Sequence, residues 1–297
     1  MDFGRLLTAM VTPFDDNLKI DWERTGRLVD ELIEKQRSDG LVVAGTTGES
    51  PTLSDEEKLA LIAFVVRRAN GRAKVIAGTG SNDTSHSIHL TQEAEKLGVD
   101  GIMLVSPYYS RTSQEGLIAH FRAVAAATSL PVMIYNIPSR TGINIEAKTM
   151  LELARTPNIV AVKESSGDLD QMSAILAEAP EGFRLYSGDD SLTLPVLAIG
   201  GHGIVSVTSH LVGGLMKSLI EAYVSGDTAR AAQLHLRLMP MYKGMFFCPH
   251  RVPNPVPVKY ALKSNGLDCG GVRLPLVDVT PEEASFIDAL VASYKEA

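Results

Sequence analysis

The stretch Asn158-Ile-Val-Ala-Val-Lys163-Glu-Ser-Ser-Gly167-Asp begins with an unbroken apolar run, most of which favours β-structure. A run of this kind, closed by a glycine, predicts a strand that is buried on both faces, as in a parallel sheet. The lysine that follows would lie at the carboxyl end of this strand, with its amine facing a cleft. Because an ordinary amine is protonated at pH 7, a nucleophilic lysine needs such a desolvated place. A strand-end lysine paired with a surface carboxylate is the alternative interpretation.

The pattern around this stretch recurs along the chain. A short apolar run, a turn of glycine or small polar residues and a segment of helical period follow one another from residue 4 onward. Alternating strands and helices predict right-handed crossovers and a parallel sheet. Eight units in about 220 residues predict an α/β fold of the (β/α)8 TIM-barrel type, with an open doubly wound sheet as the alternative. The predicted strands are 6–11, 41–44, 74–77, 101–105, 131–135, 159–162, 183–186 and 203–207, and the predicted helices are 22–37, 54–69, 84–97, 115–127, 146–154, 169–178, 191–199 and 211–223.

Helix signals refine this pattern. Ser54 with Glu57, and Thr112 with Glu115, match the capping box that begins many helices. After about residue 224 the alternation stops, and helical segments near 227–241, 254–265 and 281–294 follow. We therefore predict two regions: a barrel over 1–224 and a C-terminal helical region over 225–297.

Composition narrows the class of protein. The net charge of −7 and the pI near 5.5 argue against nucleic acid or an anionic membrane as the main partner. Two cysteines cannot form a disulfide framework and fit a reducing compartment. No apolar stretch approaches the ~20 residues of a membrane span, and the run near the amino terminus is too short for a signal peptide. We expect a cytoplasmic protein.

Polar side chains gather where the predicted strands end. Gly45-Thr-Thr-Gly-Glu-Ser50 follows the second strand, Tyr135-Asn-Ile-Pro-Ser-Arg140 ends the fifth, and Ser187-Gly-Asp-Asp190 ends the seventh. Barrel enzymes place their active sites at this face. The convergence favours a functional interpretation of Lys163.

These residue types fit imine chemistry on a keto acid. Lys163 could form a Schiff base that acts as an electron sink, and Tyr135 could shuttle protons. Thr46, Thr47 and the backbone around Gly188 could hold a carboxylate through neutral donors. Arg140 could grip a second carboxylate with two hydrogen bonds. Packing of the tyrosine and a tight turn at the threonines are the alternatives.

Cofactor motifs are lacking. Gly78-Thr-Gly80-Ser-Asn has no third glycine for a dinucleotide fingerprint, and no P-loop occurs. Cys248-Pro-His250 has no further ligands at metal spacing. Asp189-Asp190 could bind a cation, but a helix cap is the favoured interpretation. We predict no metal, flavin or nicotinamide.

Taken together, the motifs resemble the dihydrodipicolinate synthase family, within the pyruvate-dependent class I aldolases that include N-acetylneuraminate lyase. The resemblance covers essentially the whole chain, and the motifs occur in the family's order. They are Gly45-Thr-Thr-Gly-Glu-Ser50, Pro107-Tyr-Tyr109, Tyr135-Asn-Ile-Pro-Ser-Arg-Thr-Gly142, Val162-Lys-Glu164, Ser187-Gly-Asp-Asp190 and Asn254-Pro-Val-Pro-Val-Lys259.

The resemblance implies condensation of pyruvate with L-aspartate 4-semialdehyde to 4-hydroxy-tetrahydrodipicolinate, on the route to diaminopimelate and lysine, without a cofactor. It implies a homo-oligomer, either a dimer or a tetramer built as a dimer of dimers, in which Tyr109 reaches a neighbouring subunit. The implied roles are Schiff-base formation for Lys163, a proton relay for Tyr135, Thr46 and Tyr109, pyruvate-carboxylate binding for Thr47, Gly188 and Val205, and semialdehyde-carboxylate binding for Arg140.

One departure concerns feedback by lysine. Inhibited members of the family bind lysine at their dimer interface through residues matching Ser50, Pro51, Asp55, Lys58, Asn82, His86 and Tyr108. Inhibited bacterial members typically have His at the positions matching 55 and 58, and Glu at the position matching 86. Here these are Asp55, Lys58 and His86, so we predict weak or absent inhibition.

Two other functions remain open. A sister aldolase such as N-acetylneuraminate lyase shares the lysine but usually takes a polyhydroxylated sugar, for which Arg140 is not expected. A non-catalytic paralogue that binds a keto acid should have lost Lys163 or a relay hydroxyl, and this chain has kept them.

Overall fold

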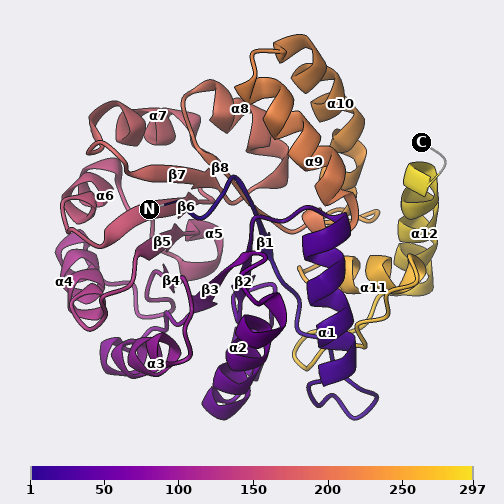
Figure 1. Cartoon of the computed structure of the whole chain (residues 1–297), viewed down its shortest axis with the longest axis horizontal. Coiled ribbons are helices and arrows are strands. Elements are labelled where there is room, and N and C mark those ends of the chain that lie inside the picture. Colours follow the sequence, from indigo (N-terminus) through magenta and orange to yellow (C-terminus); the bar gives the residue numbers. More distant parts are fainter. Residues whose placement is uncertain (1, 296–297) are drawn as a thin grey trace.

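Eight parallel strands close into a barrel in the computed structural model, which describes residues 2–295 (Figure 1). Each strand pairs with its sequence neighbours, and β1 also pairs with β8. The predicted TIM barrel is therefore confirmed, and the open-sheet alternative is wrong. The strands are β1 (Leu6–Ala9), β2 (Gly40–Val43), β3 (Lys74–Gly78), β4 (Gly101–Val105), β5 (Val132–Asn136), β6 (Ile159–Glu164), β7 (Arg184–Ser187) and β8 (Gly203–Ser206).

Helices connect the strands and cover the outside of the barrel (Figure 1). The predicted helix over 22–37 is interrupted, because α1 passes into a π-helical turn over Glu31–Lys35. The helices are α1 (Trp22–Asp30), α2 (Asp55–Ala69), α3 (Thr84–Lys96), α4 (Gln114–Ala125), α5 (Pro138–Thr141), α6 (Ala147–Ala154), α7 (Leu169–Glu178), α8 (Thr193–Ala198) and α9 (Ser209–Val224).

The two predicted capping boxes have different outcomes. At α2 the Ser54 hydroxyl accepts from the Glu57 amide while the Glu57 carboxylate accepts from the Ser54 amide, as predicted. At α4 the prediction is one residue early, since the cap is Ser113, whose hydroxyl accepts from the Gly116 amide. Ser113, directly after Thr112, thus takes the place of the predicted cap and binds the amide of the third helical residue.

Alternation along each strand decides which side chains enter the barrel. On β6, Ala161 belongs to the inner apolar cluster, whereas Val162 belongs to the outer layer beneath the helices. Because successive side chains point to opposite faces, Lys163 points inward and Glu164 outward. The unbroken apolar run thus reflects burial on both faces.

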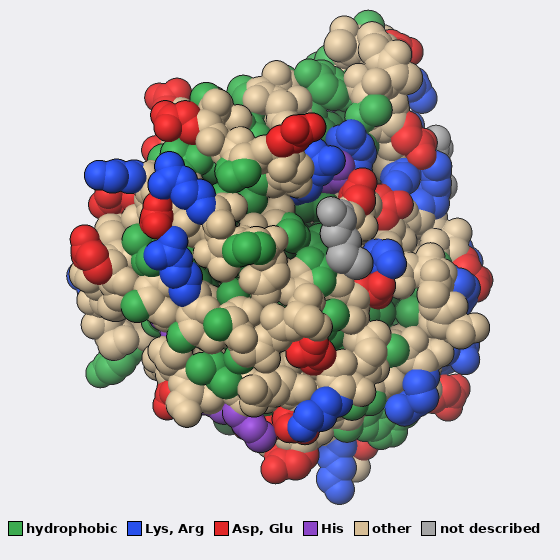
Figure 2. All heavy atoms as spheres, turned by 60° about the vertical axis from the view of Figure 1, so that its left-hand side comes forward, with side chains coloured by type: hydrophobic (Ala, Val, Ile, Leu, Met, Phe, Trp, Pro, Cys, Tyr) green, Lys and Arg blue, Asp and Glu red, His purple; other side chains and the backbone are tan. Residues whose placement is uncertain are grey.

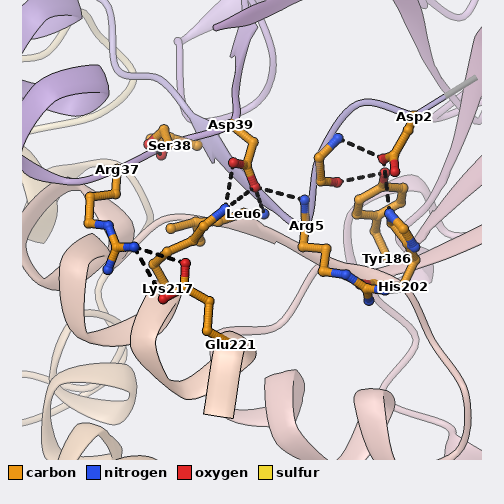
Figure 3. Close-up of polar contacts among 12 residues, drawn as sticks. Asp2, Arg5, Leu6, Arg37, Ser38, Asp39, Tyr186, His202, Lys217 and Glu221 are labelled. Atoms are coloured by element: carbon orange, nitrogen blue, oxygen red, sulfur yellow. Dashed lines mark hydrogen bonds and ion pairs between the residues drawn. The ribbon is translucent and has the colours of Figure 1, made fainter. Parts of the chain in front are cut away.

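The amino-terminal segment is bound at the amino-terminal ends of the strands, where its polar contacts are shown in Figure 3. The Asp39 carboxylate accepts from the amides of Arg5 and Leu6 at 2.8 and 3.0 Å and also pairs with Lys217. The hydroxyl of Tyr186, an inward-facing residue of β7, donates to the carbonyl of Gly4 at 2.9 Å. The strand carboxyl ends lie at the opposite end of the barrel.

The chain continues beyond α9 in three more helices, α10 (Thr228–Gly244), α11 (Val256–Ser264) and α12 (Pro281–Lys295). They lie together on one side of the barrel, coloured orange to yellow in Figure 1, and α10 packs against α9. Both cysteines are buried free thiols. Among residues 2–295, no helix combines the length and apolar character needed to cross a membrane. Figure 2 shows acidic and basic side chains interspersed on one face, with hydrophobic side chains scattered between them.

Asp190 is a buried carboxyl in the turn after β7. One of its oxygens accepts from the amides of Val207 and Thr208 at 3.3 and 3.0 Å, while the other has no partner in the described part of the chain. Asp189, not Asp190, caps the short 3₁₀ turn over Asp190–Leu192. Burial raises the pKa of Asp190 to about 6.

This raised pKa predicts a pH-dependent stability. Between the unfolded pKa of about 3.9 and the folded value, the folded state binds more protons, so Asp190 destabilises the fold increasingly as pH rises. We expect Asp190→Asn to lose this penalty and to gain about 2 kcal/mol relative to the parent between pH 4.5 and 7.5. Urea unfolding of both proteins at the two pH values measures this. A difference between them that is independent of pH would contradict it.

Candidate active site

A cavity of about 730 Å³ opens at the carboxyl end of the barrel. Its wall is formed by the loops that follow β2, β3, β4 and β5. Four of the predicted site residues line it, namely Thr46, Tyr109, Tyr135 and Arg140. A cavity of this size can enclose a small metabolite.

Lys163 lies beside this cavity, next to Tyr135. The register of β5 and β6 pairs the two residues, and both face the barrel interior. The Lys163 side chain is buried, with Nζ 4.1 Å from the centre of the Tyr135 ring. Within residues 2–295 its amine has no hydrogen bond and no carboxylate partner. This position does not fit the alternative of a lysine paired with a surface carboxylate.

Gly188 lies against the Lys163 stem. A Cβ atom at this position would lie 3.0 Å from Lys163 Cε and 1.8 Å from Ser165 Oγ. The Gly188 amide donates to the Glu164 carbonyl at 2.7 Å, so this amide is already satisfied. The absence of a side chain here leaves room for the lysine.

Gly188→Ala should therefore displace Lys163 from its place. We expect kcat/KM for the reaction proposed below to fall roughly 10²-fold, because small displacements of a reacting group are costly. Gly214→Ala is the matched control, since the nearest atom to its added methyl lies 3.5 Å away. Steady-state kinetics of both variants measure the effect. Equal activities would show that this contact does not position the lysine.

The other predicted carboxylate-binding residues lie deeper. Val205 on β8 is fully buried and belongs to the same inner cluster as Tyr135. Thr47 is buried in the loop after β2, where its hydroxyl accepts from Nδ2 of Asn254 at 2.9 Å. Neither residue lines the cavity.

Tyr109 lies at the rim of the cavity with 92% of its surface exposed. Its φ of 76° is in the left-handed region, and Arg111 nearby has a φ of 46°. Such backbone is strained for residues other than glycine and is found preferentially at functional sites. In the single chain, Tyr109 is therefore not packed onto Lys163 or Tyr135.

A buried polar network lies behind Lys163. Both oxygens of Glu164 accept from Nδ2 of Asn136, at 3.1 and 3.0 Å, and one also accepts from the Ser166 amide at 2.8 Å. Burial raises the pKa of the Glu164 carboxyl. The pair links the ends of β5 and β6 directly beyond Tyr135 and Lys163. Sequence reasoning assigned Glu164 no role, although an acid next to an apolar run buried on both faces indicates a buried carboxyl.

A second part of the same cavity contains the residues expected to bind lysine in inhibited family members, Ser50, Pro51, Asp55, Lys58, Asn82, His86 and Tyr108. Asp55 lies 2.7 Å from Nε2 of His86 and 3.4 Å from Nζ of Lys58. Burial alone would raise the pKa of Asp55, but these two partners hold it below its usual value. The Asp55 carboxylate is thus already paired.

Metal-binding donors do not converge in the described part of the chain. Within residues 2–295, no three His, Cys, Asp or Glu side chains are arranged to hold one ion. The side chains of the cavity wall instead supply hydroxyls, a guanidinium and, beside Tyr135, an amine.

Comparisons with known proteins show which proteins have a similar sequence and a similar fold. The sequence model of the Dihydrodipicolinate synthetase family matches residues 2–293. A 4-hydroxy-tetrahydrodipicolinate synthase of Moorella thermoacetica is 57% identical over 289 residues, 97% of each chain. A dihydrodipicolinate synthase of Bacillus anthracis has 47% identity and a TM-score of 0.95 over 99% of both chains. One from Cyanidioschyzon merolae, solved with lysine bound, has 43% identity and a TM-score of 0.94 over 98% of both chains.

Proposed function

The chain belongs to the dihydrodipicolinate synthetase family, and from this premise we propose that it condenses pyruvate with L-aspartate 4-semialdehyde to 4-hydroxy-tetrahydrodipicolinate. This reaction belongs to the biosynthesis of diaminopimelate and lysine. The observation that carries the proposal is the buried strand-end Lys163, whose amine has no partner within residues 2–295 and lies 4.1 Å from the Tyr135 ring beside a cavity.

The reaction begins at the Lys163 amine, which attacks the ketone carbon of pyruvate. Loss of water from the resulting carbinolamine gives an imine, and the imine draws electrons from the neighbouring methyl group. Removal of a methyl proton then gives an enamine, the carbon nucleophile. Tyr135 lies against Lys163, with Nζ 4.1 Å from the centre of its ring, and we assign its hydroxyl to the transfer of these protons, with Thr46 on the cavity wall as the next group of the relay.

The second substrate enters through the cavity. The enamine carbon attacks the aldehyde, a carbon–carbon bond forms, and the aldehyde oxygen takes up a proton to become the hydroxyl of the product. The amine of the semialdehyde then attacks the imine carbon, which forms the carbon–nitrogen bond of the ring and releases Lys163 as the free amine. Arg140 is exposed on the cavity wall and has no carboxylate partner among residues 2–295, so its guanidinium is available for the semialdehyde carboxylate. Gly188 lies against the Lys163 stem, and we assign it, together with Thr47 and Val205, to the pocket that holds the pyruvate carboxylate.

Tyr109 completes the relay in a second copy of the chain. Its exposure and strained backbone fit a side chain that becomes buried only on association. The working enzyme is therefore a homodimer or a homotetramer. We also propose that it works in the cytoplasm, where its metabolite substrates are. The interspersed charges of Figure 2 give a nucleic acid no continuous basic surface on that face.

Aldehyde selectivity tests the proposal. Purified protein is supplied with pyruvate plus L-aspartate 4-semialdehyde, or with pyruvate plus N-acetylmannosamine. We expect turnover with the semialdehyde only. Turnover with the sugar only would support the sister-aldolase function and overturn the assignment of Arg140.

Lysine should inhibit the enzyme weakly or not at all. A bound lysine needs a free carboxylate for its ammonium, but Asp55 is already paired with His86 and Lys58. Initial rates against added lysine measure this, and half-inhibition below about 1 mM, a binding free energy of roughly −4 kcal/mol, would contradict it. The triple variant Asp55→His, Lys58→His and His86→Glu is the matched control and should be more sensitive.

A further inference from the structure

The C-terminal region reaches back to the loop that carries both threonines. This loop, residues 45–50, follows β2, with Thr46 half-buried on the cavity wall and Thr47 and Glu49 buried beneath it. Asn254 and Lys259 contact the loop from more than 200 positions away in sequence. These contacts have no part in the proton relay described above.

Lys259 is the second buried lysine near the site, and its contacts differ from those of Lys163. Its Nζ donates to the carbonyls of Thr12 and Gly271, at 2.9 and 2.5 Å, and to a carboxylate oxygen of Glu49 at 3.0 Å. Burial lowers the pKa of Lys259, but the Glu49 carboxylate opposes this shift. Three acceptors match the three protons of an ammonium group. Lys259 is therefore a satisfied cation and not a nucleophile.

Glu49 is held in an unusual conformation by this contact. Its side chain is fully buried, its φ is 57°, and its second carboxylate oxygen accepts from the Arg273 amide at 2.9 Å. Its own amide donates to the Thr46 carbonyl at 3.1 Å. A left-handed backbone at a residue other than glycine persists only where its surroundings enforce it. The Lys259 ammonium and the Arg273 amide thus both hold the Glu49 carboxylate beneath the turn that carries Thr46 and Thr47.

Asn254 acts on the Thr47 hydroxyl itself. Its Nδ2 donates to Thr47 Oγ1 at 2.9 Å, and both side chains are buried. A hydroxyl carries one proton, so a threonine that accepts from an amide keeps this proton for another acceptor. In the proposed function, that acceptor is the pyruvate carboxylate.

We propose that Asn254 and Lys259 are positioning residues of the reaction: Asn254 directs the Thr47 hydroxyl toward the keto-acid carboxylate, and Lys259, through Glu49, holds the loop that carries it. The inference rests on the proposed function and extends the site into the C-terminal region. It predicts that both residues affect pyruvate binding more than semialdehyde binding.

A double-mutant cycle tests the role of Asn254. Asn254→Leu has a similar size but cannot donate, and Thr47→Val removes the hydroxyl. Borohydride trapping of the pyruvate imine against pyruvate concentration measures keto-acid binding without the aldol step. We expect each variant to raise the half-saturating pyruvate concentration about tenfold, the effect of one hydrogen bond, with the KM for semialdehyde within about twofold. The double variant should match Thr47→Val, because Asn254 acts through Thr47.

The outcomes separate this inference from the proposed function. Effects that multiply in the double variant, or an Asn254→Leu curve that equals the parent's, overturn the role of Asn254. Parent protein that traps no pyruvate overturns the proposed function, and this inference with it.

Lys259 is tested with a compensated pair of variants. Lys259→Met leaves Glu49 buried without a counterion and is expected to unfold at lower temperature. Lys259→Met with Glu49→Gln removes both charges and should recover the fold, as judged by thermal unfolding. We expect the pyruvate concentration for half-maximal trapping to stay about tenfold above the parent's, because the loop is no longer held. A trapping curve equal to the parent's in this folded double variant overturns the role of Lys259.

Discussion

Replacement of Lys163 by alanine is expected to lower kcat by roughly 10⁴-fold or more, because removal of a covalent nucleophile leaves only binding and orientation. The same variant should form no borohydride-trapped adduct with pyruvate. In the parent, the adduct should map to the peptide that contains Lys163. Lys163 is suited to this chemistry because its buried amine has no competing partner within residues 2–295.

Two controls make this result specific. Lys263→Ala removes an exposed lysine on α11 and should leave both turnover and trapping unchanged. Lys259→Met with Glu49→Gln removes a second buried amine and, at saturating pyruvate, should still trap pyruvate at Lys163. Turnover that survives in Lys163→Ala, or an adduct at any other lysine, would remove the Schiff base from the mechanism.

Replacement of Tyr135 by phenylalanine is expected to lower kcat by roughly 10²- to 10³-fold with little loss of stability. The ring remains available to pack against Lys163 in the inner cluster, and only the hydroxyl is lost. Proton transfers in imine formation and in the aldol step should both slow. Steady-state kinetics with pyruvate and the semialdehyde, together with thermal unfolding, separate the two effects.

Tyr186→Phe is the matched control for this change. Tyr186 also faces the barrel interior, but its hydroxyl donates to the Gly4 carbonyl at the other end (Figure 3). Loss of this bond should cost about 1 kcal/mol of stability and leave kcat unchanged. If the two variants lost activity equally, the effect of Tyr135 would be structural.

The fold could be predicted from local patterns in the sequence. Runs such as the one before Lys163 identified the strands, and the observed strand ends differ from the predicted ones by no more than a few residues. Errors occurred where neighbouring residues compete for one role, as with Thr112 and Ser113 at the start of α4. Both the strand positions and the helix cap depend on residues that are close together in the sequence. A strand depends on the residues of one short run, and a capping side chain lies three residues before the amide that it binds.

The sequence predicted only part of the candidate site. The resemblance nominated the residues of the cavity wall, but Asn254 and Lys259 received no role although their motif was recognised. Glu164 was quoted beside Lys163, and its hydrogen bonds with Asn136 were not foreseen. Each of these residues depends on a partner that another segment supplies.

The sequence by itself therefore determined the barrel and the place of Lys163 at a strand end, because short apolar runs and helical periods are properties of consecutive residues. The run before Lys163 is apolar on both faces, so the structure decided that this lysine points inward. Only the tertiary structure decided that Thr47 is paired with Asn254, 207 positions away, and Glu49 with Lys259, 210 positions away. A buried polar group must find a hydrogen-bond partner, but nothing in its local sequence says which distant group that will be.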